Sequence, residues 1–396
     1  MKTKNTFIRK LIPDPAAYPA KRLFALDFLR GADMLVLVAW YAIGTAIGKA
    51  YELGDGWMYQ FKHPWIGFTL WDFISPLFLF VVGAAVPLAL AKRLTEEGKT
   101  GWNYWKHVLA RIAMLWVLGG IVQCAWLSFD PMKMTPYGNT LQTISIGYFL
   151  SALIYPIRRT WVRWAIVIAG VAAYQIPLCI YGNWTANGSL VALVELPIWR
   201  AILPEGNVYL GPWWWGLTRF LGIPMFLFMC ATGMESTLFL LRKDVSPWRK
   251  AGGLSAVGAV LCLLGFFFWK VLDIPLLKQL YTISIMCLTQ GLCLLLLAAT
   301  YVVTDIWKFR RGTGIVLLWG QCALFAYFVS HVFSGSYTSI TARCLQGLPR
   351  LIADQRIISV AHAVFSMAVL TFFMAVWRQF RAAMKAPGAQ KPDAAR

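Results

Sequence analysis

The sequence contains many apolar runs of about twenty residues, the length that an α-helix needs to cross the hydrocarbon layer of a membrane. In such a layer every backbone N–H and C=O must be hydrogen-bonded, which favours helices. Of the 396 residues, 59% are hydrophobic and 14% are charged, whereas a soluble domain has roughly 45–50% and 25%. These values exclude a secreted, disordered, fibrous or ordinary cytosolic protein. We therefore expect an all-α polytopic transmembrane helical bundle.

Ten segments have the length and apolarity of a membrane span. They cover residues 23–47, 69–91, 109–128, 139–157, 161–181, 213–240, 251–270, 280–303, 314–336 and 355–377. No internal repeat and no long linker separates them. A single transmembrane domain is therefore expected over residues 23–380, after a basic segment at 1–22 and before a flexible basic tail at 381–396.

Lys and Arg gather in alternate loops between the apolar segments. Of these 37 residues, 25 lie on the side of both termini and nine lie on the other side. Because cytoplasmic loops are enriched in Lys and Arg, both termini are predicted to be cytoplasmic. The net charge of +20 thus comes from short clusters and not from a basic domain, so no nucleic-acid partner is expected. The lipid bilayer is the expected partner, in the inner membrane if the source is bacterial, and a homodimer is left open.

Motifs of soluble enzyme chemistry are missing from the sequence. The eight cysteines include no CxxC pair, so neither a metal site nor a disulfide framework is predicted. There is no P-loop, GxGxxG, HExxH or GxSxG motif, so nucleotide hydrolysis, zinc proteolysis and serine hydrolysis find no support. The chemistry must come from polar residues in or beside the spans, where a central charge costs at least ~2.5–3.5 kcal/mol.

Charged residues follow one another at intervals of three where the first span begins. Asp27, Arg30 and Asp33 share one face of a helix because of this spacing. One interpretation is a ladder of local ion pairs that helps the helix to pack. The other is a guanidinium group at Arg30 that binds an anionic ligand. The spacing alone leaves both open.

A histidine precedes the second span. Pro64 favours an extended conformation at His63, and Gly67 with Thr69 indicates that the helix begins nearby. A loop that folds back would bring His63 to Asp72, one turn inside the helix, and Asp72 could then orient His63 as a general base. The carboxylate is expected to raise the pKa of His63 above its usual ~6.5. A purely structural histidine at the membrane surface is the alternative.

Other polar and aromatic residues have two interpretations each. Gln142, Arg219, Gln321 and His331 fit hydrogen bonds between helices, with ligand contacts as the alternative. The tryptophans of the outer segments fit an interfacial aromatic belt, with stacking on sugar rings as the alternative. These tryptophans are Trp57, Trp65, Trp184 and Trp213, Trp214 and Trp215.

Three motifs occur in order within the first 90 residues. They are Leu26-Asp27-Phe28-Leu29-Arg30-Gly31, His63-Pro64-Trp65-Ile66-Gly67, and the stretch that begins Asp72-Phe73-Ile74-Ser75-Pro76 and ends at Gly83. Shorter matches follow at Leu141-Gln142, Leu280-Tyr281-Thr282-Ile283-Ser284 and Ser330-His331-Val332-Phe333. Together these stretches resemble the heparan-alpha-glucosaminide N-acetyltransferase family and its bacterial relatives, over nearly the whole chain.

This resemblance implies a transmembrane N-acetyltransferase. Acetyl would pass from cytoplasmic acetyl-CoA, a co-substrate, to the amine of an outward-facing glucosamine-type sugar, with no metal. The resemblance implies His63 and Asp72 as catalytic residues. The candidates for binding acetyl-CoA are Arg30, Asp27 and Gln142. Candidates for binding the amino-sugar or glycan acceptor are Trp65, Trp40, His331 and Gln321.

The chain departs from the family pattern at several positions. Trp40 and Gln321 stand where asparagine is common, and Thr143 stands where arginine is common. The stretch 211–216 replaces an Asp-Pro-Glu-Gly motif. These changes concern the acceptor more than the reaction type. A membrane O-acyltransferase of a surface glycan is therefore one alternative. A sugar or organic-anion transporter is another, although the paired broken helices of transporters are not visible in the sequence.

Overall fold

The computed structural model describes residues 12–16, 18, 23–95, 98–138, 140–210 and 220–385. Within these ranges the chain forms helices and no strand, apart from one isolated β-bridge between Leu94 and Thr100. The predicted all-α class is therefore confirmed. Eight of the described helices are long and apolar enough to cross a membrane, as expected for a multi-pass membrane protein.

The chain splits into two compact units. Unit 1 consists of Met1–Met58 and Val303–Arg396, and unit 2 consists of Tyr59–Val302. The single domain predicted over residues 23–380 is thus divided between them. We describe each unit by itself.

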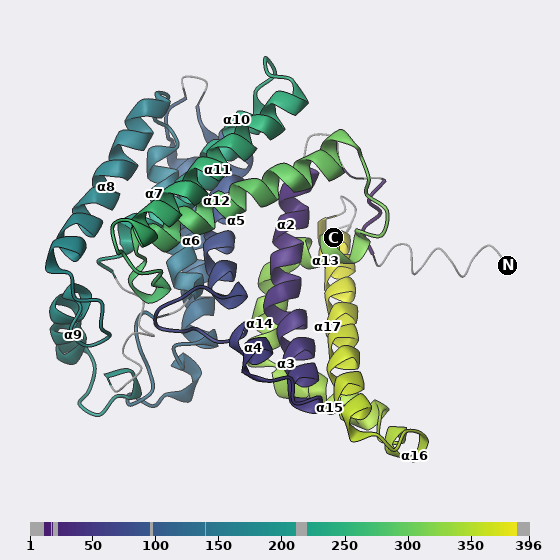
Figure 1. Cartoon of the computed structure of the whole chain (residues 1–396). Coiled ribbons are helices and arrows are strands. Elements are labelled where there is room, and N and C mark those ends of the chain that lie inside the picture. The colour runs from purple at the N-terminus through teal and green to yellow at the C-terminus, as the bar shows by residue number, and fades with distance from the viewer. Residues whose placement is uncertain are drawn as a thin grey trace, which may run out of the picture. The chain divides into compact units, whose positions relative to one another are not determined.

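Unit 1 is built around a first span that continues through a short π-helix. Its elements are α2 (Phe24–Met34), the π-helix η1 (Leu35–Trp40), α3 (Tyr41–Ala50), α13 (Gly314–Gln321), α14 (Ala323–Val332), α15 (Ser334–Cys344), α16 (Leu348–Leu351) and α17 (Gln355–Lys385). α3 packs along α17 (Figure 1). α2 touches α13 at two glycines. A Cβ on Gly31 would lie 1.8 Å from the carbonyl oxygen of Val316. A Cβ on Gly320 would lie 2.3 Å from the carbonyl oxygen of Asp27. Small residues allow this backbone contact.

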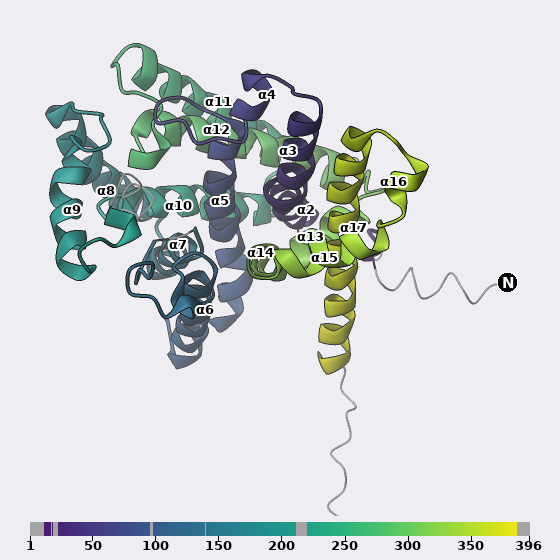
Figure 2. The same cartoon turned by 90° about the horizontal axis from the view of Figure 1, so that it is seen from below.

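Unit 2 packs around its three most buried helices, α5, α10 and α12. Its elements are α5 (Leu70–Leu90), α6 (Trp102–Val122), α7 (Thr140–Ile154), α8 (Thr160–Tyr181), α9 (Leu190–Ile202), α10 (Ile223–Leu241), α11 (Pro247–Lys270) and α12 (Ile283–Tyr301). The short helix α4 (Asp55–Tyr59) lies across the boundary between the two units in the chain. α5 packs against α7, α10 and α12 (Figure 2). A Cβ on Gly83 would lie 1.8 Å from the carbonyl oxygen of Cys230, and one on Gly233 would lie 1.9 Å from that of Phe80. This close contact with α10 fixes α5, which carries Asp72 in its first turn.

The predicted spans agree with the helices in position but not at every boundary. Eight of the ten segments correspond to the eight helices that are long enough to span. The segment 139–157 is α7, whose 15 residues extend over only about 22 Å. The segment 314–336 is two helices bent by 76°, which together would make a ninth span. The helix predicted over 213–240 begins at Ile223 in the described part, and α17 continues to Lys385, into the segment expected to be a flexible tail.

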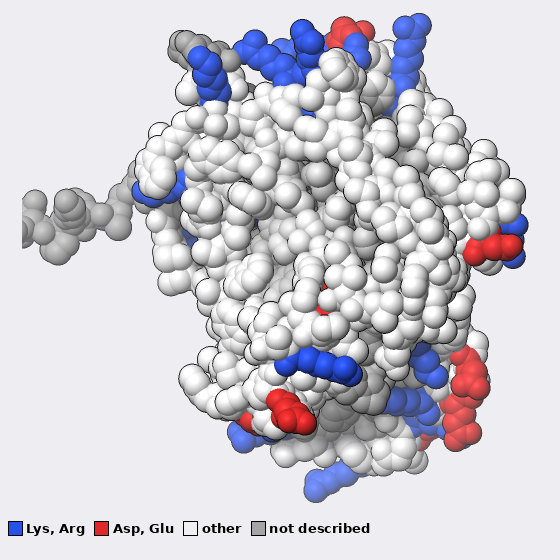
Figure 3. All heavy atoms as spheres, turned by 90° about the vertical axis from the view of Figure 1, so that its left-hand side faces the viewer, with Lys and Arg blue, Asp and Glu red and all other residues white. Residues whose placement is uncertain are grey.

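The connections of unit 2 form two ends with different charge. We call one the basic end, made by residues 91–95, 98–101, 155–159 and 242–246, and the other the His63 end, made by residues 59–69, 123–138, 182–210, 220–222 and 271–282. On the face drawn in Figure 3, Lys and Arg gather at the top with little acidic surface. Both signs are mixed at the bottom of that face, and an almost uncharged band lies between them. Such a band between two polar ends is typical of membrane proteins.

Candidate functional site

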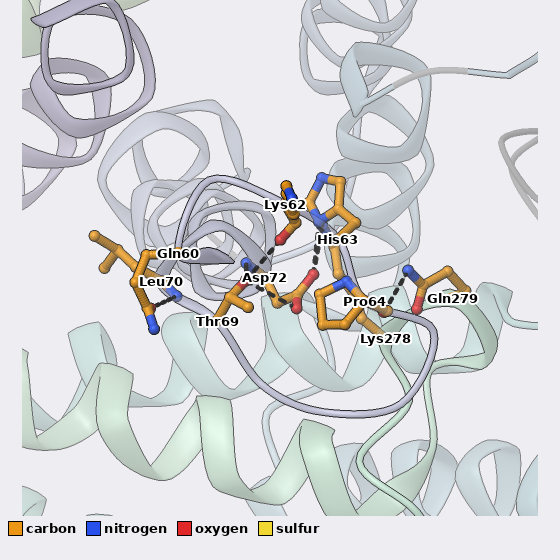
Figure 4. A network of polar contacts seen from close by, with 9 residues as sticks. All are labelled: Gln60, Lys62, His63, Pro64, Thr69, Leu70, Asp72, Lys278 and Gln279. Atoms are coloured by element: carbon orange, nitrogen blue, oxygen red, sulfur yellow. Dashed lines mark hydrogen bonds and ion pairs between the residues drawn. The ribbon is translucent and has the colours of Figure 1, made fainter. Parts of the chain in front are cut away.

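His63 and Asp72 meet at the His63 end of unit 2 (Figure 4). Nδ1 of His63 lies 2.6 Å from Oδ1 of Asp72, the separation of a short charge-assisted hydrogen bond. The side chain of Asp72 is 1% exposed, whereas that of His63 is 34% exposed. A buried carboxylate thus holds a partly exposed imidazole, and the predicted fold-back of the loop is confirmed.

Asp72 is positioned by the cap of α5. Thr69 has an extended backbone, and its Oγ1 accepts a hydrogen bond from the backbone N–H of Asp72 at 3.3 Å. The same hydroxyl lies 3.1 Å from Oδ2 of Asp72 and 3.0 Å from the carbonyl oxygen of Lys62, and donates to one of them at a time. The first turn of a helix also favours a negative charge. The carboxylate therefore has a fixed place that does not depend on His63.

The loop that carries His63 is tied to the segment before α12. The side-chain amide of Gln279 donates to the carbonyl oxygen of Pro64 at 3.1 Å, and the N–H of Gly67 donates to that of Leu276 at 2.8 Å. Gly67 has φ +133°, a conformation that side chains other than glycine rarely adopt. These bonds hold the ring of His63 over the start of α5.

Lys278 is a functional candidate that the sequence analysis missed. Its Nζ lies 3.7 Å from Oδ1 of Asp72 and 3.4 Å from Nδ1 of His63. Its side chain is only 16% exposed, in the short 3₁₀-helix η6 (Lys278–Leu280). In the sequence it is one of the nine Lys and Arg residues expected on the outer side. The sequence did offer one signal for Lys278: it lies close to apolar residues, just before the motif that begins at Leu280.

The remaining ring nitrogen of His63 is available for chemistry. The carboxylate of Asp72 can only accept, so Nδ1 carries the hydrogen and Nε2 carries the lone pair. Figure 4 shows the second ring nitrogen pointing away from Asp72. In the part of the chain that the structure describes, Nε2 has no hydrogen-bond partner. An imidazole held in this tautomer can act as a general base or as a nucleophile.

Burial lowers the pKa of His63 below its usual value. The hydrogen bond and the charge of Asp72 raise that pKa, and the ammonium of Lys278 lowers it, so the net direction is down. The expectation of a raised pKa is therefore wrong. Desolvation outweighs the carboxylate, and the lysine offsets part of its charge. At neutral pH the imidazole is in the neutral form that a base requires.

The polar stripe of the first span is only partly formed in unit 1. Arg30 pairs with Asp27 at 3.2 Å, and Oδ2 of Asp27 accepts from the hydroxyl of Tyr18 at 2.5 Å. Asp33 lies outside this ladder, because its buried carboxylate contacts no hydrogen-bond donor among the described residues. The ion-pair interpretation is thus confirmed for Asp27 and Arg30 and wrong for Asp33. The binding of acetyl-CoA by this pair stays a prediction.

Gln142 anchors the loop between α6 and α7. Its Oε1 accepts from the N–H of Gly138 at 2.9 Å, and its Nε2 donates to the carbonyl oxygen of Pro136 at 3.2 Å. The side chain is fully buried in unit 2. The amide therefore shapes the His63 end, and its contact with acetyl-CoA stays a prediction.

Two of the tryptophans predicted to bind the acceptor lie in different units. Trp65 belongs to the His63 loop, and its indole N–H donates to the carbonyl oxygen of Trp184 at 2.7 Å. This bond joins two loops of the His63 end. Trp40 ends the π-helix of unit 1 and packs edge-on against Trp57, with 5.7 Å between the ring centroids.

The other two acceptor candidates lie near the broken span of unit 1. Oε1 of Gln321 accepts from Nε of Arg378 at 3.1 Å, at the break between α13 and α14. The ring of His331 packs on Tyr327 with centroids 4.2 Å apart, and its Nδ1 lies 2.8 Å from the Tyr327 carbonyl oxygen. These contacts are structural, and the ligand roles of both residues remain predictions.

Some sequence predictions concern residues outside the described part. These are Arg219, Trp213, Trp214 and Trp215. Among the described residues, no group of three or more His, Cys, Asp or Glu side chains is arranged to hold a metal ion. No family model matches the sequence, and no curated protein sequence matches it. The resemblance to the heparan-alpha-glucosaminide N-acetyltransferase family therefore stays a prediction.

Proposed function

We propose that the chain is an integral membrane acetyltransferase that moves acetyl from cytoplasmic acetyl-CoA to the amine of an outward-facing glucosamine-type sugar. The observation that carries the proposal is the His63–Asp72 pair, with Nδ1 bound to a buried carboxylate and Nε2 available. Acyl transfer to an amine needs such a base, because the attacking nitrogen must lose a proton as the new bond forms. The ordered motifs of the resemblance support the choice of donor and acceptor.

In the proposed reaction His63 first accepts a proton and then donates the same proton. The neutral amine attacks the carbonyl carbon of the thioester while Nε2 of His63 accepts the proton of the amine. The C–S bond then breaks, and the imidazolium gives that proton to the leaving thiolate, which yields the amide and CoA. Asp72 stabilises the imidazolium in between, as the carboxylate does in a Ser-His-Asp triad. General base catalysis of this kind contributes typically ~10²–10⁴ in rate.

The proposed topology has the basic end of unit 2 in the cytoplasm and the His63 end outside. About ten spans, counting α7 and the bent pair α13–α14, would bring both termini to the cytoplasmic side. The distribution of Lys and Arg supports this orientation. Basic loops on that side suit the phosphates of CoA, and so does Arg30 in unit 1.

The test is to measure the release of free CoA from acetyl-CoA by the protein in lipid nanodiscs. Three reactions are compared: with glucosamine, with N-acetylglucosamine, and without acceptor. N-acetylglucosamine is the matched control because its amine is blocked and its hydroxyls remain. Release that requires glucosamine supports N-acetyl transfer, and equal release with both sugars supports O-acetyl transfer. No release with either sugar would overturn the proposal, and uptake of sugar without release would favour a transporter.

A further inference from the structure

The ammonium of Lys278 shares one carboxylate oxygen with the imidazole of His63. Oδ1 of Asp72 lies 2.6 Å from Nδ1 of His63 and 3.7 Å from Nζ of Lys278. Two positive or potentially positive groups therefore converge on a single buried charge. Lys62, in the same loop as His63, is exposed and forms no ion pair among the described residues. The charged groups that face the ring are thus Asp72 from α5 and Lys278 from η6.

The segment that carries Lys278 is held from its other side by α8. The hydroxyl of Tyr174 donates to the carbonyl oxygen of Leu280 at 2.6 Å, and the amide of Gln175 donates to that of Tyr281 at 2.8 Å. Tyr281 has φ +48°, which costs free energy for a residue other than glycine. A strained residue persists only where its surroundings hold it. Lys278 is therefore presented to the pair by a fixed segment and not by a loose side chain.

The position of Lys278 is unusual for a lysine with a purely structural role. When Nδ1–H of His63 donates to Asp72, both Nδ1 and Nζ are donors, yet they lie 3.4 Å apart. Two donors approach this closely only because they share an acceptor. A lysine that merely packed there could turn its ammonium to water and avoid the contact. The arrangement balances the charge of Asp72 at the ring instead.

We propose that Lys278 is a positioning residue of the site, whose ammonium balances the charge of Asp72 so that the carboxylate orients the His63 ring while the ring stays neutral. Burial keeps the ring neutral, and without this cation the unbalanced charge of Asp72 would oppose that effect more strongly and shift the ring toward imidazolium, which cannot act as a base. The inference rests on the proposed function for its effect on turnover, but its electrostatic part concerns His63 alone.

The experiment follows the pH dependence with which diethyl pyrocarbonate modifies His63, because this reagent attacks the neutral ring. Peptide mass spectrometry separates His63 from the other three histidines. We expect Lys278→Met to raise the pKa of His63, so that modification at low pH slows severalfold. Lys278→Arg keeps the charge and should behave like the wild type. Lys62→Met is the matched control, because it removes a neighbouring lysine that is not among the charges acting on His63.

An unchanged pKa in the Lys278→Met protein would overturn the inference. If that variant does not fold, Lys278→Gln gives the same comparison with a polar side chain. Acetyl transfer is then measured on the same proteins across pH. A wild type that releases no CoA contradicts the proposed function, while the modification experiment still decides the role of Lys278. Normal transfer with no change of pKa contradicts only the inference on Lys278.

Discussion

Nδ1 of His63 lies 2.6 Å from Oδ1 of Asp72, although one residue lies in a loop and the other in the first turn of α5. The carboxylate is held by the Thr69 cap and by its burial, so contacts other than the one with the ring also fix its position. Asp72 therefore gives the partly exposed imidazole a fixed hydrogen-bond acceptor. This relationship separates the role of orienting the ring from the role of moving the proton.

Replacement of Asp72 by asparagine tests the orienting role. Asn keeps the size but offers either an acceptor or a donor to Nδ1, so part of the protein will hold the ring in the wrong tautomer. We expect kcat to fall about tenfold or more, with a smaller effect than loss of His63. The pKa of His63 should fall further, because a charge that favours imidazolium is lost. An unchanged kcat in a protein of normal thermal stability would contradict the orienting role.

Replacement of His63 by glutamine tests the proton transfer. We expect kcat to fall by about 10²-fold or more while the affinity for acetyl-CoA is kept, since a general base acts mainly in the transition state. Equilibrium binding of acetyl-CoA and the rate of CoA release are measured on the same sample. His362→Gln in α17 is the control for loss of a histidine elsewhere. Near-normal turnover of His63→Gln would return His63 to a structural role.

The His63–Asp72 pair was accessible from the sequence because its determinants are local. His63 and Asp72 are nine residues apart, and Pro64 and Thr69 lie between them. Pro64 indicates an extended loop and Thr69 indicates a helix cap, and both signals act over short distances along the chain. Lys278 was not accessible, because it reaches the site from 215 residues further along the chain. No spacing in a single sequence reports such a contact. The pKa of His63 was predicted in the wrong direction for the same reason, because its shift depends on burial and on Lys278, which a single sequence does not report.

The membrane spans were predictable from the sequence where the length of an apolar run is enough to define the helix. α12 and the π-turn that follows it, Ile283–Ile306, form one long apolar helix as expected. The break at Gln321–Cys322 was not predictable, because the apolar run continues through it without proline. The division into two units was also hidden, since it depends on packing between segments at opposite ends of the chain.

A buried ion pair between α8 and α10 predicts a stability effect far from His63. Both Nε and Nη2 of Arg163 bind the carboxylate of Glu235, and the side chains are 7% and 15% exposed. Removing one partner strands the other charge, so Arg163→Met should lower the free energy of unfolding by about 3–5 kcal/mol. Arg163→Met combined with Glu235→Gln should lose less. Thermal unfolding in one detergent measures both, and an unshifted midpoint for Arg163→Met would refute the prediction.

Arg30 tests the donor side of the proposal. If its guanidinium contacts the phosphates of CoA, Arg30→Ala should raise KM for acetyl-CoA with little change in kcat. Arg30→Lys, which keeps a charge but loses the planar fork, should lie between. Asp27→Asn breaks the ion pair of Arg30 and leaves the guanidinium in place, so it separates the two roles. A lower unfolding midpoint for both Arg30→Ala and Asp27→Asn, with an unchanged KM for acetyl-CoA, would assign Arg30 to the ladder alone.

The pH dependence follows from the lowered pKa of His63. In the unfolded chain a histidine binds its proton near pH ~6.5, whereas folded His63 binds it only at lower pH. Between these two values the unfolded state holds more protons, so the free energy of unfolding decreases as the pH falls through this window. It levels off below the folded pKa. His63→Gln should lack this component, which unfolding at several pH values will detect. At a fixed concentration of neutral amine, activity should decline about tenfold per pH unit on an acidic limb that lies below 6.5, and a limb above 6.5 under that condition would contradict a base that is neutral at pH 7.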